Sequence, residues 1–204
     1  MEKRIGFIVF EGGEGSGKTT QAKELSNRLR RLGFHVVLTH EPGGTLLGNK
    51  LRRWLKWGRG VTTQTELFLF LASRSQLVSA VIRPALDKGY IVICDRFDAS
   101  TFAYQGYGRG MDLDFLKSVN NFVTDGLCPD LTVLLDLSAE QGLGRKRMKL
   151  DVFEREEFAF HQRVREGYLK MAATEPERWM VIDATLPQEK IQQIIWERVQ
   201  KSLG

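Results

Sequence analysis

Five continuous apolar runs, separated by helical patterns, constrain the fold of this chain more than any other feature. The runs are rich in β-branched residues and do not alternate with polar ones, so both faces of the strands that they form must be covered. Such strands belong to parallel sheets, whose helical crossovers cover both faces. The pattern predicts an α/β fold with a doubly wound parallel sheet of about five strands flanked by helices. The predicted strands are 5–10, 34–40, 90–95, 131–137 and 179–184.

Helical periodicity is clearest in two stretches between these strands. Apolar residues at three- and four-residue steps precede Gly33 and predict an amphipathic helix that stops at this glycine. The stretch 65–89, "TELFLFLASRSQLVSAVIRPALDKG", predicts a second and longer helix. The periodic residues of the first helix are Ala22, Leu25, Leu29 and Leu32.

Two segments fit this alternation less well. Residues 103–112, "AYQGYGRGMD", are too rich in glycine for the interior of a helix. Residues 144–157, "GRKRMKLDVFEREE", combine charges of both signs between two helical stretches. A surface loop is the simpler interpretation of each segment. The alternative is a lid at the carboxyl ends of the strands, which we expect at about 144–156.

Length and composition limit the class of protein. With 204 residues we expect one domain over 1–204. The net charge of +5 favours anionic partners only weakly, and we expect no nucleic acid among them. Cys94 and Cys128 form no CxxC pair and are interpreted as reduced thiols. The first apolar run breaks at Glu11 and no later one approaches ~18 residues, so we expect a cytoplasmic protein without a membrane segment.

The stretch "EGGEGSGKTT" carries the most specific motif, G-x-x-x-x-G-K-[ST], directly between a predicted strand and a predicted helix. In this context backbone N–H groups and the helix N-terminus cradle phosphates. Lys18 would reach the β- and γ-phosphates, and the Thr19 hydroxyl would ligate Mg²⁺. The alternative, a plain glycine turn, does not account for the lysine and the hydroxyl. The predicted ATP-binding residues are Gly12, Gly13, Glu14, Gly15, Ser16, Gly17, Lys18, Thr19 and Thr20.

The motif predicts a nucleoside triphosphate with Mg²⁺ but not a reaction. GTPases, ATPase motors and small-molecule kinases all use it. A GTPase would need a base-reading N-K-x-D sequence, which this chain lacks. A larger ATPase usually carries partner-binding domains, for which 204 residues leave little space. A small-molecule kinase is therefore favoured.

Several further stretches suggest an acceptor site. Asp95, at the end of a predicted strand, is suited to bind Mg²⁺, and Arg96 to clamp a phosphate; a surface ion pair is the alternative. Phe70 and Arg74 lie four residues apart on one helix face, where ring and guanidinium can grip a base together, although Phe70 alone suits core packing. A Pro-Gly-Gly bend follows one strand in "HEPGGT", and "DASTFAYQGYGRG" forms a polar and aromatic cluster.

The ordered set "EGGEGSGKTT", "EPGGT", "LFLASRSQ", "CDRFDASTFAYQGYGRG" and "PDLTVLLDL" resembles the bacterial thymidylate kinases, members of the P-loop nucleoside monophosphate kinases, from Phe7 to Asp183. The resemblance implies a single-domain P-loop kinase fold with a short lid. It implies transfer of the γ-phosphoryl group of ATP to dTMP with Mg²⁺, in dTTP synthesis for DNA replication. It also implies a homodimer packed through helices.

The resemblance assigns roles to residues around the acceptor. Phe70 would stack on thymine, Arg74 would hold the base edge, and Thr101, with Gln105 as a further candidate, would hydrogen-bond the pyrimidine. Arg96 would bind the dTMP phosphate, Tyr104 would occupy the space of a ribose 2′-hydroxyl, and Pro42 would shape the pocket. Glu14 would face the acceptor near the sugar 3′-hydroxyl; a solvated loop carboxylate is the alternative.

Such a reaction needs cations more than a base. The nucleophile is a phosphate monoester oxygen, already largely dianionic at pH 7 because its second pKa is about 6, so no proton must be removed. The protein must therefore mainly position the two substrates and neutralise their negative charge. We expect Lys18, Arg96, Mg²⁺ and at least one lid arginine to do this, and a closing lid to exclude water.

The chain departs from its relatives at several positions. Some thymidylate kinases carry an arginine in the phosphate loop where this chain has Gly15, so lid arginines would supply that charge. The candidates are Arg145, Arg147 and Lys149. Arg147 is preferred because related lids space their arginines alternately and position 149 holds a lysine, which lacks the bidentate fork. Val152 and His40 stand where related enzymes often have arginine.

Two other functions stay open from the sequence. A deoxynucleoside kinase acting on thymidine or a related nucleoside would need a carboxylate base near Asp95 and Arg96. A non-catalytic nucleotide-binding or nucleic acid module would bind ATP without turnover.

Overall fold

The computed structural model describes the whole chain except residues 1–4, 59, 146–152, 154–155 and 204. Its centre is a five-stranded sheet with the order β2-β3-β1-β4-β5, and every pairing is parallel. The sheet confirms the predicted α/β class and the number of strands. Its members are β1 (Phe7–Glu11), β2 (Val36–His40), β3 (Ile91–Asp95), β4 (Leu131–Asp136) and β5 (Trp179–Asp183).

Burial differs between the central and the edge strands. All five residues of β1 are buried, as a continuous apolar run requires. The edge strands β2 and β5 are only partly covered, and Val181 in β5 is 49% exposed. An edge strand lacks a neighbouring strand on one side, so its residues are less buried than its apolar sequence predicts.

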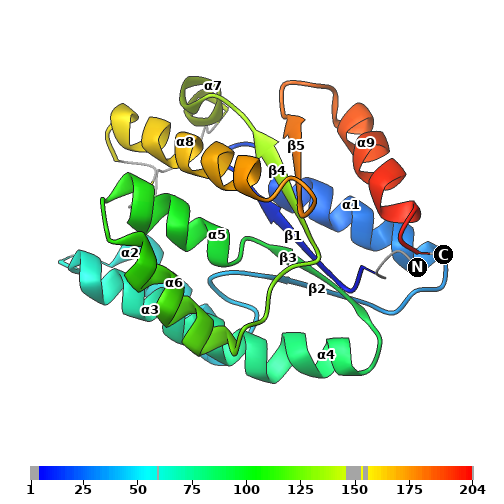
Figure 1. The fold of residues 1–204 in the computed structure, drawn as a ribbon, viewed down its shortest axis with the longest axis horizontal. Coiled ribbons are helices and arrows are strands. Elements are labelled where there is room, and N and C mark those ends of the chain that lie inside the picture. The colour runs from blue at the N-terminus through cyan, green and yellow to red at the C-terminus, as the bar shows by residue number, and fades with distance from the viewer. Residues whose placement is uncertain (1–4, 59, 146–152, 154–155, 204) are drawn as a thin grey trace.

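Helices cover the two faces of the sheet (Figure 1). The helices α1 (Lys18–Arg31) and α9 (Gln188–Gln200) share one hydrophobic cluster with the sheet, which includes Leu29 and Ile195. The opposite face packs against α3 (Thr63–Leu77) and the segments that follow it. Ala22, Leu25 and Leu29 are buried as predicted, but Leu32 is 57% exposed because α1 ends at Arg31.

The predicted helix 65–89 is helical from Thr63 to Asp87 but changes its winding. A π-helical segment, η1 (Val78–Ile82), joins α3 to α4 (Arg83–Asp87). Pro84 lies at the start of α4. Proline has no N–H to donate to the preceding turn, and a wider turn upstream relieves this loss.

This helical stretch corrects the expectation that no segment approaches the length and apolarity of a membrane span. By length and composition Thr63–Asp87 could cross a membrane, with a mean hydropathy of 1.3 over the best window. The charged residues Glu66 and Arg74 interrupt its apolar run, which is why an uninterrupted-run criterion misses it. Its Leu77 and Ile82 pack against the sheet, so its apolarity is used in the core.

The segment 103–112, expected to be a loop, is helical over most of its length. A short helix, α5 (Asp98–Thr101), continues into the π-helix η2 (Phe102–Gly108). Its glycines allow close packing against α8 (Phe158–Thr174), because a Cβ atom on Gly108 would lie 2.6 Å from Phe160 Cε2. Gly167 of α8 would likewise meet the ring of Tyr107 at 2.4 Å. The prediction was wrong over 103–108 because Gly106 and Gly108 serve tertiary packing, whereas Gly110, with a φ of 78°, lies just after the helical stretch.

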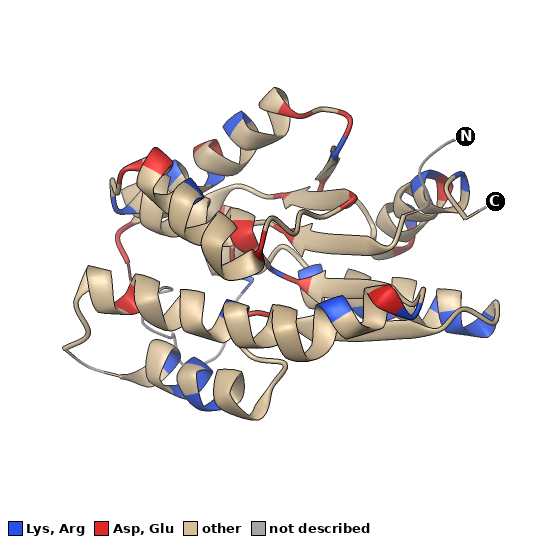
Figure 2. Cartoon of the chain, turned by 60° about the horizontal axis from the view of Figure 1, so that its bottom comes forward, with Lys and Arg blue, Asp and Glu red and all other residues tan. Residues whose placement is uncertain are grey.

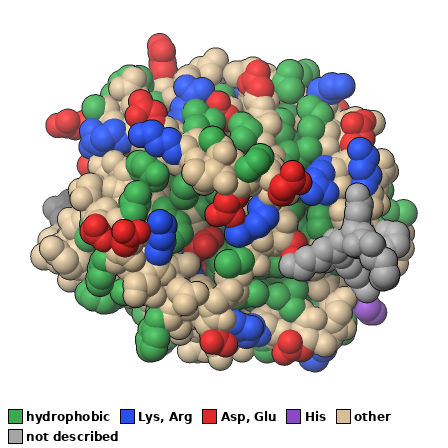
Figure 3. All heavy atoms as spheres, viewed as in Figure 1, with side chains coloured by type: hydrophobic (Ala, Val, Ile, Leu, Met, Phe, Trp, Pro, Cys, Tyr) green, Lys and Arg blue, Asp and Glu red, His purple; other side chains and the backbone are tan. Residues whose placement is uncertain are grey.

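The remaining described helices surround this framework. The helix α2 (Leu46–Trp57) packs against α3, which also contacts α6 (Leu113–Thr124), and the short α7 (Ala139–Gly144) lies near the start of α8. Charged residues of both signs are distributed along the chain (Figure 2). On the face in Figure 3, basic and acidic side chains are interspersed, so the net charge of +5 is not gathered there.

Candidate active site

The loop between β1 and α1 has the backbone of a phosphate cradle. Gly12, Gly15 and Gly17 have φ angles of 142°, 69° and 93°, and Gly17 is the residue before the first turn of α1. Gly15 also lies against α7, since a Cβ atom there would approach the Gly142 oxygen to 2.3 Å. A side chain at position 15 would therefore require α7 to move.

Lys18 is buried and points back into this loop. Its Nζ donates to the Gly13 carbonyl at 2.7 Å and to Ser16 Oγ at 3.3 Å. Burial, helped by the charge of Arg96, lowers the pKa of Lys18 to about 8. In the adjacent turn the Thr19 hydroxyl donates to the carboxylate of Asp95 at the end of β3. The Lys18 ammonium, the Thr19 hydroxyl and the Asp95 carboxylate thus lie together at the N-terminus of α1.

A cavity of about 820 Å³ extends from this loop toward α3 and η2. It joins residues that lie far apart in the sequence, from the phosphate loop, the "HEPGG" bend, α3 and the segment after β3. Among the predicted loop residues, Glu14 to Thr20 line it, whereas Gly12 and Gly13 do not. The predicted acceptor residues that line it are Pro42, Phe70, Arg74, Arg96, Thr101, Tyr104 and Gln105.

Arg96 is the most heavily bonded side chain beside the loop. Its guanidinium donates to Glu14 Oε1 at 2.7 Å, to the Gly12 carbonyl at 3.1 Å and to the hydroxyls of Tyr104 and Tyr168 at 3.1 and 3.2 Å. These oxygens raise the pKa of Arg96 well above its ordinary value despite the opposing effect of burial. Its φ of 70° is left-handed, a strained conformation for a non-glycine residue. The strain is held in place by this network.

The same network sets the direction of Glu14. Its Oε1 accepts hydrogen bonds from Arg96 and from the Tyr104 hydroxyl, the latter at 2.9 Å. Both donors belong to the segment after β3, on the predicted acceptor side. The Glu14 carboxylate therefore faces acceptor residues and is not a solvated loop group.

Glu11 is a buried carboxylate that sequence reasoning missed. It accepts from the Phe97 N–H at 2.8 Å, from the Ser100 hydroxyl at 2.7 Å and from the Tyr168 hydroxyl at 2.8 Å. Burial raises its pKa, although Arg96 opposes the shift. The available signal was a carboxylate at the end of an otherwise apolar strand, but its partners are distant in sequence, above all Tyr168 on α8.

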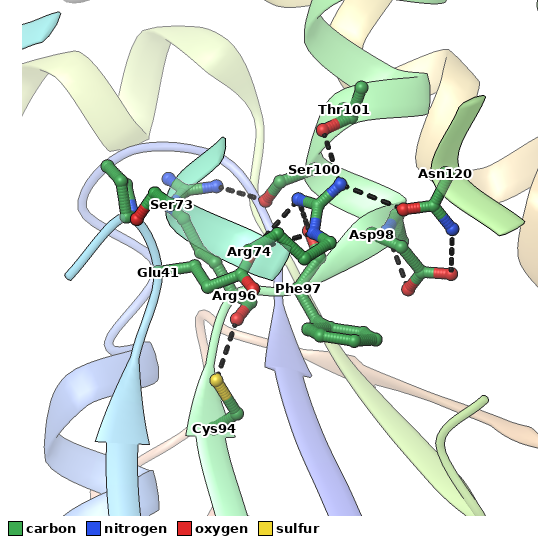
Figure 4. A network of polar contacts seen from close by, with 12 residues as sticks. Glu41, Ser73, Arg74, Cys94, Arg96, Phe97, Asp98, Ser100, Thr101 and Asn120 are labelled. Carbon is green, nitrogen blue, oxygen red and sulfur yellow. Dashed lines mark hydrogen bonds and ion pairs between the residues drawn. The ribbon is translucent and has the colours of Figure 1, made fainter. Parts of the chain in front are cut away.

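Arg74 lies in a second buried network, shown in Figure 4. Its Nε donates to Glu41 Oε2 at 2.8 Å, and its Nη1 donates to Thr101 Oγ1 and to Asn120 Oδ1, both at 3.0 Å. Burial raises the pKa of Glu41 to about 7, with Arg74 opposing the shift. The sequence did not indicate Glu41 and Asn120 as site residues, yet both hold Arg74, which it did indicate.

Aromatic rings close one side of the cavity. The Phe70 and Phe153 rings have centroids 5.8 Å apart, and Tyr104 meets Phe153 edge-on at 6.0 Å. Phe70 lines the cavity and is only partly buried, so it is not a pure core residue. Phe153 was missed because a single aromatic within a charged segment carries little signal.

Of the predicted lid residues, the structure describes Arg145, whereas Arg147, Lys149 and Val152 lie outside the described residues. The exposed Arg145 side chain donates to the Ala184 carbonyl at 3.2 Å and lies 3.5 Å from the Gly15 carbonyl. It does not line the cavity. His40 does line it, and burial together with Arg52 lowers its pKa.

Comparison with known proteins gives one consistent result. The thymidylate kinase family model matches residues 10–195. The chain is 53% identical over 201 residues to a thymidylate kinase of Dehalococcoides mccartyi strain CBDB1, covering 97% of each chain. It is 48% identical to one of Thermomicrobium roseum, over 95% of this chain and 93% of that one. The crystal structure of thymidylate kinase from Ehrlichia chaffeensis matches with a TM-score of 0.80 at 35% identity, over 98% and 99% of the two chains. This chain belongs to the thymidylate kinase family.

Proposed function

We propose that this protein transfers the γ-phosphoryl group of ATP to dTMP, giving ADP and dTDP, in dTTP synthesis for DNA replication. An oxygen of the dTMP phosphate forms the new bond to the γ-phosphorus, and the bond from that phosphorus to the β–γ bridging oxygen breaks. The observation that carries the proposal is the cavity of about 820 Å³, which is lined by the phosphate loop and by the acceptor residues together. Membership in the thymidylate kinase family supports the same substrates.

Lys18, Thr19 and Asp95 would hold the donor side. Lys18 would bind the β- and γ-phosphates, which would restore its full positive charge. Thr19 and Asp95 contribute a hydroxyl and a carboxylate, hard oxygen donors that fit Mg²⁺. The described residues contain no group of three or more His, Cys, Asp or Glu that could hold a metal. When bound, Mg²⁺ would neutralise charge on the transferring phosphates.

Arg96 would bind the phosphate of dTMP. Its network keeps the guanidinium charged and oriented, and Glu14 balances that charge until a phosphate arrives. Glu14 would then accept a hydrogen bond from the sugar 3′-hydroxyl, and Tyr104 would exclude a 2′-hydroxyl. No general base is required because the attacking oxygen already carries negative charge.

The base would lie between the aromatic and polar residues of the cavity. Phe70 would stack on thymine, while Arg74, Thr101 and Gln105 would contact its polar edge. The partners of Arg74 support this function, since four hydrogen bonds hold the guanidinium before substrate binds. Pro42 would close the pocket from the bend after β2.

A lid over about 144–156 would complete the site. Among Arg145, Arg147 and Lys149 we favour Arg147 as the group that reaches the transferring phosphoryl. The contact of Gly15 with Gly142 supports a cation from the lid, because α7 occupies the space that a side chain at position 15 would need.

We further propose a single domain over 1–204 that acts as a cytoplasmic homodimer, with no nucleic acid or membrane partner. The helices α2, α3 and α6 are adjacent and together expose large apolar side chains to solvent. A group of exposed apolar side chains on neighbouring helices is typical of a protein–protein interface. The residues are Leu46, Leu47, Trp54 and Trp57 on α2, Phe68 on α3, and Phe115 and Phe122 on α6.

An assay of ADP release against dTMP, dUMP and thymidine tests the proposed reaction. We expect rapid turnover with dTMP and none with thymidine, whose 5′-hydroxyl must lose a proton. Preferential use of thymidine would instead identify a deoxynucleoside kinase. ATP binding without turnover of any acceptor would identify a non-catalytic nucleotide-binding module.

A further inference from the structure

The carboxamide of Gln105 is held from one side by a buried carboxylate. Gln105 Nε2 donates to Glu66 Oε1 at 2.9 Å. Both residues are buried, with 1% and 7% of their surface exposed, and they come from η2 and α3. Gln105 lines the cavity, whereas Glu66 lies behind it.

Glu66 is itself fixed by Arg109. The guanidinium donates from Nε to Glu66 Oε1 at 2.9 Å and from Nη2 to Glu66 Oε2 at 3.0 Å, a bidentate arrangement. Arg109 Nη2 also lies 3.0 Å from Glu156 Oε1. The hydrogen bonds that Arg109 donates to Glu66 and Glu156, and the charges of these carboxylates, raise the pKa of Arg109 against the effect of burial. Both oxygens of the carboxylate that holds Gln105 are therefore bound by one guanidinium, and the carboxylate cannot rotate freely.

This arrangement dictates which way the Gln105 amide faces. Both oxygens of Glu66 accept hydrogen bonds from Arg109, so Glu66 faces the NH₂ group of the amide and not its oxygen. The carboxamide oxygen is then the free end of the side chain. No residue that the structure describes donates a hydrogen bond to it.

We infer that Glu66 and Arg109 are positioning residues that set base specificity by presenting the Gln105 oxygen to the acceptor base. An oxygen at this place accepts a hydrogen bond from the ring N3–H of thymine or uracil. Cytosine carries a lone pair at N3, so two acceptors would face each other. This inference rests on the proposed function. It deepens that function by naming the residues that would distinguish thymine and uracil from cytosine.

The variant Glu66→Gln tests this inference because it changes one oxygen to NH₂ at constant shape. Residue 66 would then offer one oxygen to three N–H donors, Gln105 Nε2 and Arg109 Nε and Nη2, so it would no longer fix which end of the Gln105 amide faces the base. We expect the ratio of kcat/KM for dTMP over dCMP to fall by about 10- to 100-fold, the range for one unmade buried hydrogen bond. The ratio of kcat/KM for dTMP over dUMP should stay unchanged, because the bases of these two substrates differ only in a methyl group.

Two further variants separate an effect on the orientation of Gln105 from a general loss of stability. Glu175→Gln removes the carboxylate of an exposed ion pair with Arg178, outside the cavity, and should leave both ratios unchanged. Arg109→Lys keeps a cation beside Glu66 but loses the bidentate fork, so the dTMP to dCMP ratio should fall by a smaller factor. The KM for ATP and the thermal midpoint report whether each variant is folded.

An unchanged dTMP to dCMP ratio in Glu66→Gln, with the KM for ATP intact, would overturn the inference. If that variant does not fold, an unchanged ratio in Arg109→Lys decides against it. Equal losses of dTMP and dCMP turnover would also count against it, because a merely structural role predicts them. Failure of the wild-type protein to use dTMP would instead overturn the proposed function.

Discussion

At the scale of single residues, the site is a set of buried and partly buried charges that pair with one another. Arg96 is paired with Glu14, and Arg74 with Glu41, each at 2.7 or 2.8 Å. Burying such groups without partners would cost several kcal/mol, so each arginine requires its carboxylate. The charge of Lys18 is stabilised less strongly, because the hydrogen bonds described for its ammonium go to the uncharged Gly13 carbonyl and Ser16 hydroxyl. Its ammonium is therefore the charge most easily lost.

The lowered pKa of Lys18 predicts a pH dependence of ATP use. With a pKa of about 8, the free protein loses the ammonium charge as the pH rises through that value. We expect kcat/KM for ATP, which reports groups of the free enzyme, to fall above pH 8. Bound phosphates favour the ammonium, so kcat at saturating ATP should hold to higher pH. Initial rates from pH 6 to 10 measure both profiles.

Lys18→Arg is the matched control for this profile, because arginine stays charged throughout this pH range. Its residual kcat/KM should lack the fall near pH 8. A wild-type kcat/KM that is flat to pH 9.5 would contradict the assignment of this titration to Lys18.

At the scale of elements, the π-helix η2 determines the shape of the acceptor side. It carries Tyr104 and Gln105 and packs against α8, from which Tyr168 reaches Glu11 and Arg96. The close approach depends on glycine on both elements, at Gly108 and at Gly167. Glycine in a helix usually costs stability, so its presence here reflects packing.

We predict that Gly108→Ala destabilises the protein by about 1–3 kcal/mol, the usual cost of overpacking a core. The added methyl group would meet the buried ring of Phe160 at 2.6 Å. Urea unfolding measures the effect, and the KM for dTMP should rise with it. Gly144→Ala is the control, since no described atom lies within 4 Å of its added Cβ. Equal stability of the two variants would refute the packing role of Gly108.

At the scale of the whole molecule, the apolar surface over α2, α3 and α6 is the feature that the folded monomer leaves unexplained. Phe122 is 85% exposed and Phe68 is 58% exposed, on neighbouring helices. Isolated exposed apolar residues are ordinary, but a group on three adjacent helices is not. The proposed homodimer would bury it.

We predict that Phe68→Glu shifts the protein from dimer to monomer, because burying the new carboxylate in an apolar interface is costly. Sedimentation equilibrium over a range of protein concentrations measures the shift. Leu32→Glu is the control, since Leu32 is similarly exposed but lies at the end of α1, outside this surface. A monomeric wild-type protein would contradict the proposal outright.

Much of the fold was predictable because its determinants are local. The strands were placed within a few residues, since runs such as residues 91–94 in β3 are apolar by themselves. The phosphate loop follows from adjacent residues between β1 and α1. The resemblance of several short motifs to thymidylate kinases also led to seven predicted acceptor residues, and all seven line the cavity.

The partners of those residues, by contrast, were decided by tertiary structure alone. Glu11 meets Tyr168, and Gln105 meets Glu66, across 157 and 39 positions of the chain. A buried carboxylate carries no local pattern, because its role depends on which donors the folded chain brings within about 3 Å. The sequence by itself determined the class of fold and the identity of the phosphate loop, since both arise from neighbours along the chain. Which charges pair, which way an amide faces and which glycines allow close packing depend on distant segments, and only the folded structure decides them.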